Sequence, residues 1–137
     1  MTEENKSIVR RVFDEAWNKR DFDVVDEIFS EYFTGHDPFF DEWDGPDGHK
    51  GIMNTVLAAF PDARFTLNDV IAEEDRVVTR WTTMGTHKGE FNGVPPTSKI
   101  TAVTGNTIWR IRDGQIAEAW NNWDTLGLLK QLGAVRG

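Results

Sequence analysis

Cysteine is absent from the sequence, which excludes disulfide bonds, thiolate nucleophiles and thiolate metal ligands. Long apolar stretches are absent too, and none approaches the roughly 20 residues that a membrane-spanning helix needs. The opening segment, MTEENKSIVRR, is polar and lacks the apolar core of a secretory signal peptide. These absences predict a soluble, cytoplasmic protein.

Basic side chains are scarce. The chain has 15 Lys and Arg against 23 Asp and Glu, which gives a formal net charge of -8. Nucleic acids and anionic membranes are bound through clustered Lys and Arg. Such clusters are missing from this sequence, so we expect neither nucleic acid nor a membrane as a partner.

Motifs for metals and nucleotides are missing as well. The acidic segment 41–45 lacks the alternating oxygen ligands of a calcium loop, and Ile52 stands where the distal Glu of such a loop belongs. Gly85, Gly89 and Gly93 are not followed by the Lys-Ser or Lys-Thr pair of a phosphate-binding loop. We therefore expect no metal ion and no cofactor.

The 137 residues fit a single domain, residues 1–137, of a size that buries a core without disulfide bonds. Apolar side chains recur first at helical spacing and later at every second position. Helices followed by antiparallel strands are typical of an α+β fold, in which the helices cover one face of the sheet. The predicted elements are helices over residues 3–18, from Asp21 and over 49–60, and strands over 64–73 and 76–87.

Two further segments complete the predicted order. Residues 32–36 indicate a short strand, and residues 37–48, which are acidic and aromatic and hold two of the five prolines, indicate a loop. The length of that loop favours a lid across a pocket mouth. At the other end, Asp124 can cap a short helix that Gly133 terminates.

The most informative stretch is TAVTGNTIWRIRDGQIAEAWNNWD, residues 101–124, which predicts two antiparallel strands joined by an Asp-Gly turn. Three of the six tryptophans lie on it, so we expect it to form a wall of a ligand pocket. Two registers are possible. A two-residue turn would pair Arg112 with Gln115, whereas a three-residue turn would pair Ile111 with Gln115.

We favour the three-residue turn because it places the opposite charges of Arg110 and Glu118 together on one face. The other face, which we expect to meet a ligand, then carries Thr107, Trp109 and Ile111 beside Ala117, Ala119, Asn121 and Trp123. Large apolar groups remain on both faces, so the second face is expected to contact a partner or a second layer. A slip of one residue would exchange the two faces.

Five segments, in order and spacing, resemble the SnoaL-like polyketide cyclases. They are GHDP (35–38), FPDARF (60–65), GTHKGEFNGVPPTSK (85–99), WRIRDGQIAEAW (109–120) and WDTLGLLKQLG (123–133). The resemblance covers nearly the whole chain. It implies the fold of the nuclear transport factor two superfamily, a curved sheet wrapped by helices into a cone with a deep apolar pocket, and a homodimer formed through the outer sheet face.

The resemblance also implies a chemistry. Members of that family close the last ring of an aromatic polyketide ester by intramolecular aldol condensation, with an Asp as acid/base, an assisting His and no cofactor. Asn121 matches the position of the Asp, and Thr107 matches that of the His. Neither side chain can act as a base that removes a proton at neutral pH. Among other acid/base candidates, His36 and Asp37 follow the first short strand and could reach the pocket mouth, although a His-Asp-Pro turn is also an ordinary connector.

Several further side chains are candidates for the pocket wall, each with an ordinary structural alternative. Trp17, Trp81, Trp109 and Trp123 suit a flat aromatic ligand but are equally common in a core, and Ala119 shares the expected inner face. His87 ends a strand, where a solvated histidine is as ordinary as a functional one. Asp124 is favoured as a helix cap over a base. We expect His49 on the solvent side of the third helix, without a role.

Two functions are compatible with these residues. The first is a cofactor-independent, cyclase-type enzyme in which Asn121 and Thr107 orient an enolisable, apolar carbonyl or ester substrate while a nearby His or Asp moves the proton. The second is a protein of the same fold that binds an apolar, aromatic molecule without turning it over. Nothing in the sequence selects between polyketides, terpenoids and other apolar esters.

Overall fold

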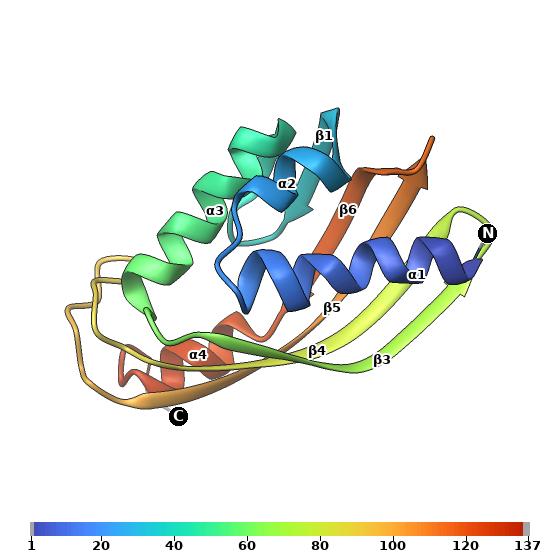
Figure 1. Cartoon of the computed structure of the whole chain (residues 1–137). Coiled ribbons are helices and arrows are strands. Elements are labelled where there is room, and N and C mark those ends of the chain that lie inside the picture. Colours follow the sequence, from blue (N-terminus) through green and yellow to red (C-terminus); the bar gives the residue numbers. More distant parts are fainter. Residues whose placement is uncertain (1, 136–137) are drawn as a thin grey trace.

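The computed structural model describes residues 2–135 as helices packed on one curved, unclosed six-stranded sheet, which confirms the α+β prediction (Figure 1). The elements are α1 (Thr2–Arg11), the π-helix η1 (Val12–Trp17), α2 (Asp23–Ile28), β1 (Phe29–Asp37), β2 (Asp41–Asp44), α3 (Gly45–Ala59), β3 (Arg64–Glu73), β4 (Arg76–Thr86), β5 (Ile100–Arg112), β6 (Gln115–Trp123) and α4 (Thr125–Gln131). None of these helices is long and apolar enough to cross a membrane.

The strands are ordered β2-β1-β6-β5-β4-β3, and every neighbouring pair is antiparallel except β1 with β6. Side chains along β5 alternate between buried and exposed over nearly its whole length, as expected for a strand with one face on a core. We call the face turned toward the helices the inner face and the opposite one the outer face. Helices α1, α2 and α3 lie on the same side of the sheet (Figure 1).

The turn of the long hairpin has two residues, so the prediction of a three-residue turn is wrong. Asp113 and Gly114 both have positive φ, 52° and 76°, which is the signature of a type I′ turn, and Arg112 pairs with Gln115. The next pair joins Ile111 to Ile116, so Ile111 does not lie beside Ala117 as expected.

A β-bulge then restores the predicted faces. Arg110 pairs with Glu118, which leaves Ala117 as an extra residue in β6. Because one extra residue reverses the alternation of side chains, Thr107 meets Asn121 on the inner face, while Arg110 and Glu118 form an ion pair of 3.1 Å on the outer face. The expected partition of this part of the hairpin is therefore present, but it comes from a bulge and not from the turn.

The predicted helix over residues 3–18 is divided into α1 and η1. At its end the backbone N–H of Asn18 donates to the carbonyl of Phe13, five residues back, at 2.9 Å. The Asn18 side chain then exchanges two hydrogen bonds with the backbone of Phe65 on β3, at 2.8 and 2.9 Å. This double contact fixes the end of η1 against the sheet.

The segment 37–48 is not one long loop. A turn at 38–40 leads into β2, which pairs with the end of β1, and α3 begins at Gly45 with Pro46 in its first turn. Proline is well suited to that position because its missing N–H has no partner in a first turn. The third helix therefore starts four residues before the predicted His49, and this earlier start changes the surroundings of His49.

Candidate functional site

A cavity of about 120 Å³ lies between the inner face of the sheet and the helices. Eleven of its 23 lining residues are Phe or Trp, contributed by helices, strands and connecting segments. They are Phe13, Trp17, Phe33, Phe40, Trp43, Phe60, Phe65, Trp81, Phe91, Trp109 and Trp123. The wall is therefore suited to an apolar, flat ligand.

Seven of the ten sequence-predicted site residues line this cavity. They are Trp17, Trp81, Thr107, Trp109, Ala119, Asn121 and Trp123. The structure does not bring the other three, His36, His87 and Asp124, into its lining. The seven come from η1, β4, β5 and β6. Five of them lie on β5 and β6, where Thr107 pairs with Asn121 and Trp109 pairs with Ala119.

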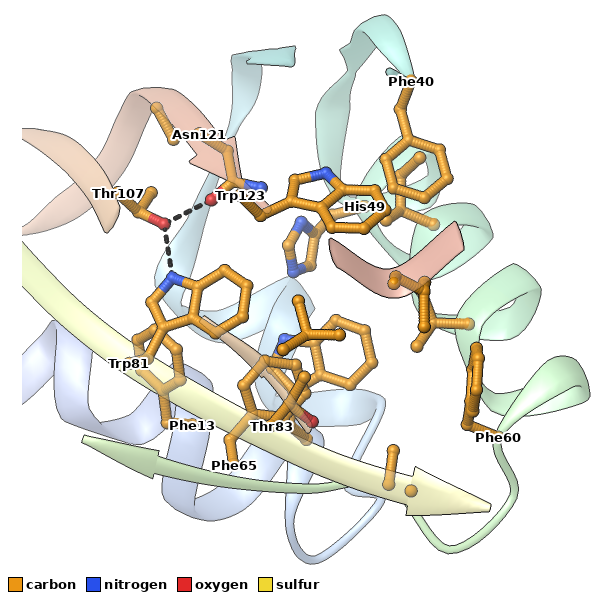
Figure 2. A pocket seen from close by; sticks show the side chains of 18 of the residues that line it. Phe13, Phe40, His49, Phe60, Phe65, Trp81, Thr83, Thr107, Asn121 and Trp123 are labelled. Atoms are coloured by element: carbon orange, nitrogen blue, oxygen red, sulfur yellow. Dashed lines mark hydrogen bonds between the residues drawn. The ribbon is translucent and has the colours of Figure 1, made fainter. Parts of the chain in front are cut away.

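A chain of hydrogen bonds crosses one wall of the cavity (Figure 2). The indole N–H of Trp81 donates to Thr107 Oγ1 at 2.9 Å, and the Thr107 hydroxyl donates to Asn121 Oδ1 at 2.5 Å. Asn121 Nδ2 in turn donates to Asp37 Oδ2 at 2.7 Å. Trp81 fits because its cross-strand neighbour is Gly105, where a Cβ would lie 2.3 Å from the indole ring.

Asp37 anchors this chain and is itself only 5% exposed. Besides Asn121 it accepts from the indole N–H of Trp123 at 3.3 Å and from the backbone N–H groups of Phe39 and Phe40 at 2.7 and 3.1 Å. With these contacts both carboxylate oxygens are engaged. The network therefore fixes the orientation of the Asn121 amide but leaves no uncommitted base along it.

His49 is the residue for which the sequence-based expectation is wrong. It is 5% exposed and lines the cavity, although we placed it on the solvent side of its helix. Its ring stacks on Phe29 at 4.4 Å between centroids and meets Phe33 edge-on at 6.0 Å. Neither ring nitrogen has a hydrogen-bond partner in the structure, and burial lowers the pKa of His49 to about 3. The imidazole is therefore neutral at neutral pH.

A pattern in the sequence could have located His49. His49, Ile52 and Val56 follow helical spacing and all three line the cavity. Gly45 and Pro46 favour a loop before His49, so the helix was predicted to begin at His49. We therefore treated His49 as a helix end in contact with solvent and not as part of the buried helix face. Figure 2 shows His49 among the aromatic side chains of the pocket.

Two more buried polar atoms of the cavity lining lack a hydrogen-bond partner in the structure: the indole nitrogen of Trp43 and the hydroxyl of Thr83. Unpaired buried donors and acceptors cost free energy, so such atoms in a cavity indicate where polar groups of a ligand can bind. Among residues 2–135, no three His, Asp or Glu side chains are grouped so that they could hold a metal ion.

His36 lies on the outer face and not at the cavity. It pairs with Trp120 in the parallel ladder of β1 and β6 and stacks on that ring at 5.7 Å. Its Nε2 lies 2.7 Å from Glu118, and its Nδ1 lies 3.4 Å from Glu42. Burial raises the pKa of Glu118, but hydrogen bonds from His36 and Arg110 outweigh it, and the net pKa is lowered. This position argues against the catalytic role we assigned to His36.

The other two candidates do not line the cavity, although His87 Nε2 is buried without a hydrogen-bond partner in the structure. His87 is fully buried, which rules out a solvated histidine; its Nδ1 lies 3.0 Å from Thr97 Oγ1, and its ring packs on Phe60. Asp124 accepts a hydrogen bond from the backbone N–H of Gly127 at 2.8 Å and caps α4, as the favoured alternative predicts.

The curved sheet with its helices and internal cavity is the fold of SnoaL-like and nuclear transport factor two-like proteins. The family model described as SnoaL-like polyketide cyclase matches residues 7–132. This chain therefore belongs to the SnoaL-like polyketide cyclase family, and the resemblance inferred from its sequence is confirmed. No curated protein sequence matches it.

Solved structures with similar folds come from several bacteria. A proposed SnoaL-like polyketide cyclase from Jannaschia sp. CCS1 is 26% identical over 98% of this chain and 95% of its own, with a TM-score of 0.90. IdmH from Streptomyces antibioticus, a proposed polyketide cyclase, is 30% identical over 94% and 98%, with a TM-score of 0.83. AclR from Streptomyces galilaeus, a proposed hydroxylase, is 29% identical over 100% and 89%, with a TM-score of 0.89.

Proposed function

We propose that this protein is a cyclase-type enzyme acting on an apolar, aromatic carbonyl or ester compound held in the cavity. In the reaction a proton leaves a carbon next to a carbonyl, and the resulting enolate carbon attacks a second carbonyl carbon of the same molecule. A carbon–carbon bond forms, and the attacked carbonyl oxygen takes up a proton. The reaction is a rearrangement that needs acid/base groups but no oxidant or reductant.

The observation that carries this proposal is an aromatic cavity with a single titratable side chain, His49, among the 23 lining residues. Aromatic walls hold a flexible substrate folded and keep water away from the enolate. A neutral imidazole can donate a hydrogen bond to the oxygen on which the negative charge develops. Its low pKa makes it a weak base in the empty cavity, and a neighbouring enolate would raise that pKa again.

The Trp81–Thr107–Asn121–Asp37 network has a positioning role in this proposal. Its hydrogen bonds hold the Asn121 amide in one orientation, with one N–H directed to Asp37. The second N–H of the amide is left to contact a substrate oxygen. Asn121 and Thr107 therefore orient the substrate, and His49 takes the acid/base role that we first assigned to His36.

Enolisation can be measured without knowing the natural substrate. We expect the protein to accelerate deuterium exchange at the α-carbon of ethyl benzoylacetate above the buffer background, and NMR spectra of aromatic polyketide esters to show ring closure, which leaves their mass unchanged. The acceleration should be lost in His49→Phe and kept in His36→Gln, a matched change on the outer face. Exchange that is no faster than background, or unchanged in His49→Phe, would contradict the proposal.

A second candidate function is binding without turnover. It is favoured by the committed polar network and by the weak basicity of His49, which leave the cavity without a strong base. Tryptophan fluorescence should then report binding of an aromatic polyketide, and chromatography with NMR of the recovered ligand should show an unchanged structure. Recovery of a cyclised product would exclude this alternative.

We also propose a homodimer formed through the outer sheet face. Ile71, Val78, Ile108 and Trp120 are aligned across β3, β4, β5 and β6, and the first three are 63%, 37% and 37% exposed. An apolar row of this kind across a sheet is costly to leave in water. Light scattering should give twice the chain mass, and Ile108→Glu should give the monomer.

A further inference from the structure

We propose that a carbonyl oxygen of the ligand binds between the indole N–H of Trp43 and a ring N–H of His49. This inference rests on the proposed function, because it assumes that the cavity takes an apolar carbonyl compound. It adds the chemical group that the cavity recognises and the two side chains that recognise it.

The first support is the unpaired state of both groups. Trp43 Nε1 and both His49 nitrogens are buried and have no hydrogen-bond partner in the structure, and both residues line the cavity. Their rings are neighbours, with centroids 6.4 Å apart, yet they make no hydrogen bond with each other. An indole N–H can only donate, so the missing partner of Trp43 must be an acceptor.

The second support is that Trp43 is held in place. It stands opposite Gly35 in the β1–β2 ladder, and a Cβ at Gly35 would lie 2.4 Å from the indole ring. A Cβ at Gly48, on α3, would lie 3.4 Å from the Cβ of Trp43, which is an ordinary contact. The absence of a side chain at Gly35 lets the large ring pack closely against β1, so its N–H is fixed before a ligand arrives.

Among residues 2–135, no other side chain or backbone group forms a hydrogen bond with a His49 ring nitrogen. Phe29 covers one face of the imidazole, and Phe33 and Trp17 meet it edge-on at 6.0 and 6.5 Å. A neutral imidazole donates from one nitrogen and accepts at the other. A ketone or ester oxygen has two lone pairs and can accept from both donors at once.

The test uses two probes of nearly equal shape. Acetophenone carries a C=O group where α-methylstyrene carries C=CH₂, and each has one aromatic ring, which suits a cavity of about 120 Å³. We expect the wild-type protein to bind acetophenone roughly ten-fold or more tightly than α-methylstyrene, measured by NMR titration. The indole N–H proton of Trp43 should move downfield with acetophenone only.

Variants locate the effect. Trp43→Phe and His49→Phe should each reduce the ketone preference several-fold while the hydrocarbon still binds. Trp109→Phe is the matched aromatic control, since the indole N–H of Trp109 is already bonded to Thr79 at 3.0 Å. Thr104→Val is the polar control, because Thr104 is exposed on the outer face of β5 and does not line the cavity. Both controls should keep the preference.

Each result has a definite meaning. Equal binding of the two probes, or a preference that survives in both Trp43→Phe and His49→Phe, overturns the carbonyl site but leaves an apolar ligand cavity. Binding of neither probe overturns the carbonyl site and the proposed function together. An unshifted Trp43 signal in the wild-type protein also overturns the inference, and this readout does not depend on any variant folding correctly.

Discussion

The two histidines His49 and His36 lie on opposite sides of the same sheet and show how differently its faces treat a titratable group. His49 is enclosed by aromatic rings, has no hydrogen-bond partner and has a lowered pKa. His36 is 32% exposed and lies between the carboxylates of Glu118 and Glu42. The comparison teaches that burial among aromatic rings leaves His49 without a protein partner, whereas the outer face provides His36 with carboxylate partners.

The largest expected effect concerns the pH dependence of stability. The pKa of His49 is about 3 when folded and near 6.5 when unfolded, so between these values the unfolded chain binds more protons. Protonation of His49 therefore does not lower the free energy of unfolding above pH 6.5. As the pH falls below 6.5, the free energy of unfolding decreases by up to about 1.4 kcal/mol per pH unit. Urea unfolding at pH 7, 6 and 5 should show this slope.

Variants test whether His49 is the cause of that slope. His49→Phe should flatten the dependence between pH 7 and 5, and His36→Gln should leave the His49 contribution intact. If His49→Phe keeps the wild-type slope, the buried and neutral state of His49 is wrong, and the contrast between the two faces loses its main support.

The second effect concerns hydroxyl groups on the two faces of β5. Thr107→Val removes an acceptor from Trp81 and a donor from Asn121 in a buried setting, which should lower the free energy of unfolding by about 1–2 kcal/mol. Thr104→Val, on the exposed face of the same strand, should change it by less than about 0.5 kcal/mol. Chemical denaturation measures both variants, and equal effects would remove the distinction between the faces.

The smallest effect is expected for the ion pairs of the outer face. In the monomer that Ile108→Glu should give, Glu118→Gln weakens contacts with His36 and Arg110 that are partly open to water, so the loss of stability should be below about 1 kcal/mol and should shrink in high salt. Unfolding in low and high salt provides the measurement. A larger loss that is independent of salt in this monomer would contradict the water-exposed state of the outer face.

Most of the fold could be predicted from local patterns. The change from helical spacing to alternation gave the α+β order, and alternation along β5 identified Thr107 and Trp109 as partners of the β6 residues on the inner face. The type of turn was mispredicted because the pairing of Arg110 with Glu118 can arise from a bulge as well as from a longer turn. A single extra residue, Ala117, separates these two possibilities, and neither composition nor spacing reveals where it is inserted.

The candidate site was less predictable because its parts meet through distant contacts. His36 was placed near the pocket on the basis of its position after a strand, but the parallel pairing of β1 with β6 turns its side chain outward, beside Trp120. Asp37, the next residue, is buried for the same reason and reaches Asn121 and Trp123. Side chains of adjacent residues in a regular strand point to opposite faces of the sheet. Only the pairing of the strands in the sheet decides which of the two points inward.

The sequence by itself determined the class of fold and the aromatic character of the cavity wall. These features depend on residue identity and short-range periodicity, which are present before the chain folds. Only the tertiary structure decided that His49 lies buried beside Trp43 while His36 lies on the outer face. Burial and hydrogen-bond partners come from segments far apart in the chain, and these two factors set the pKa and the chemistry of a side chain.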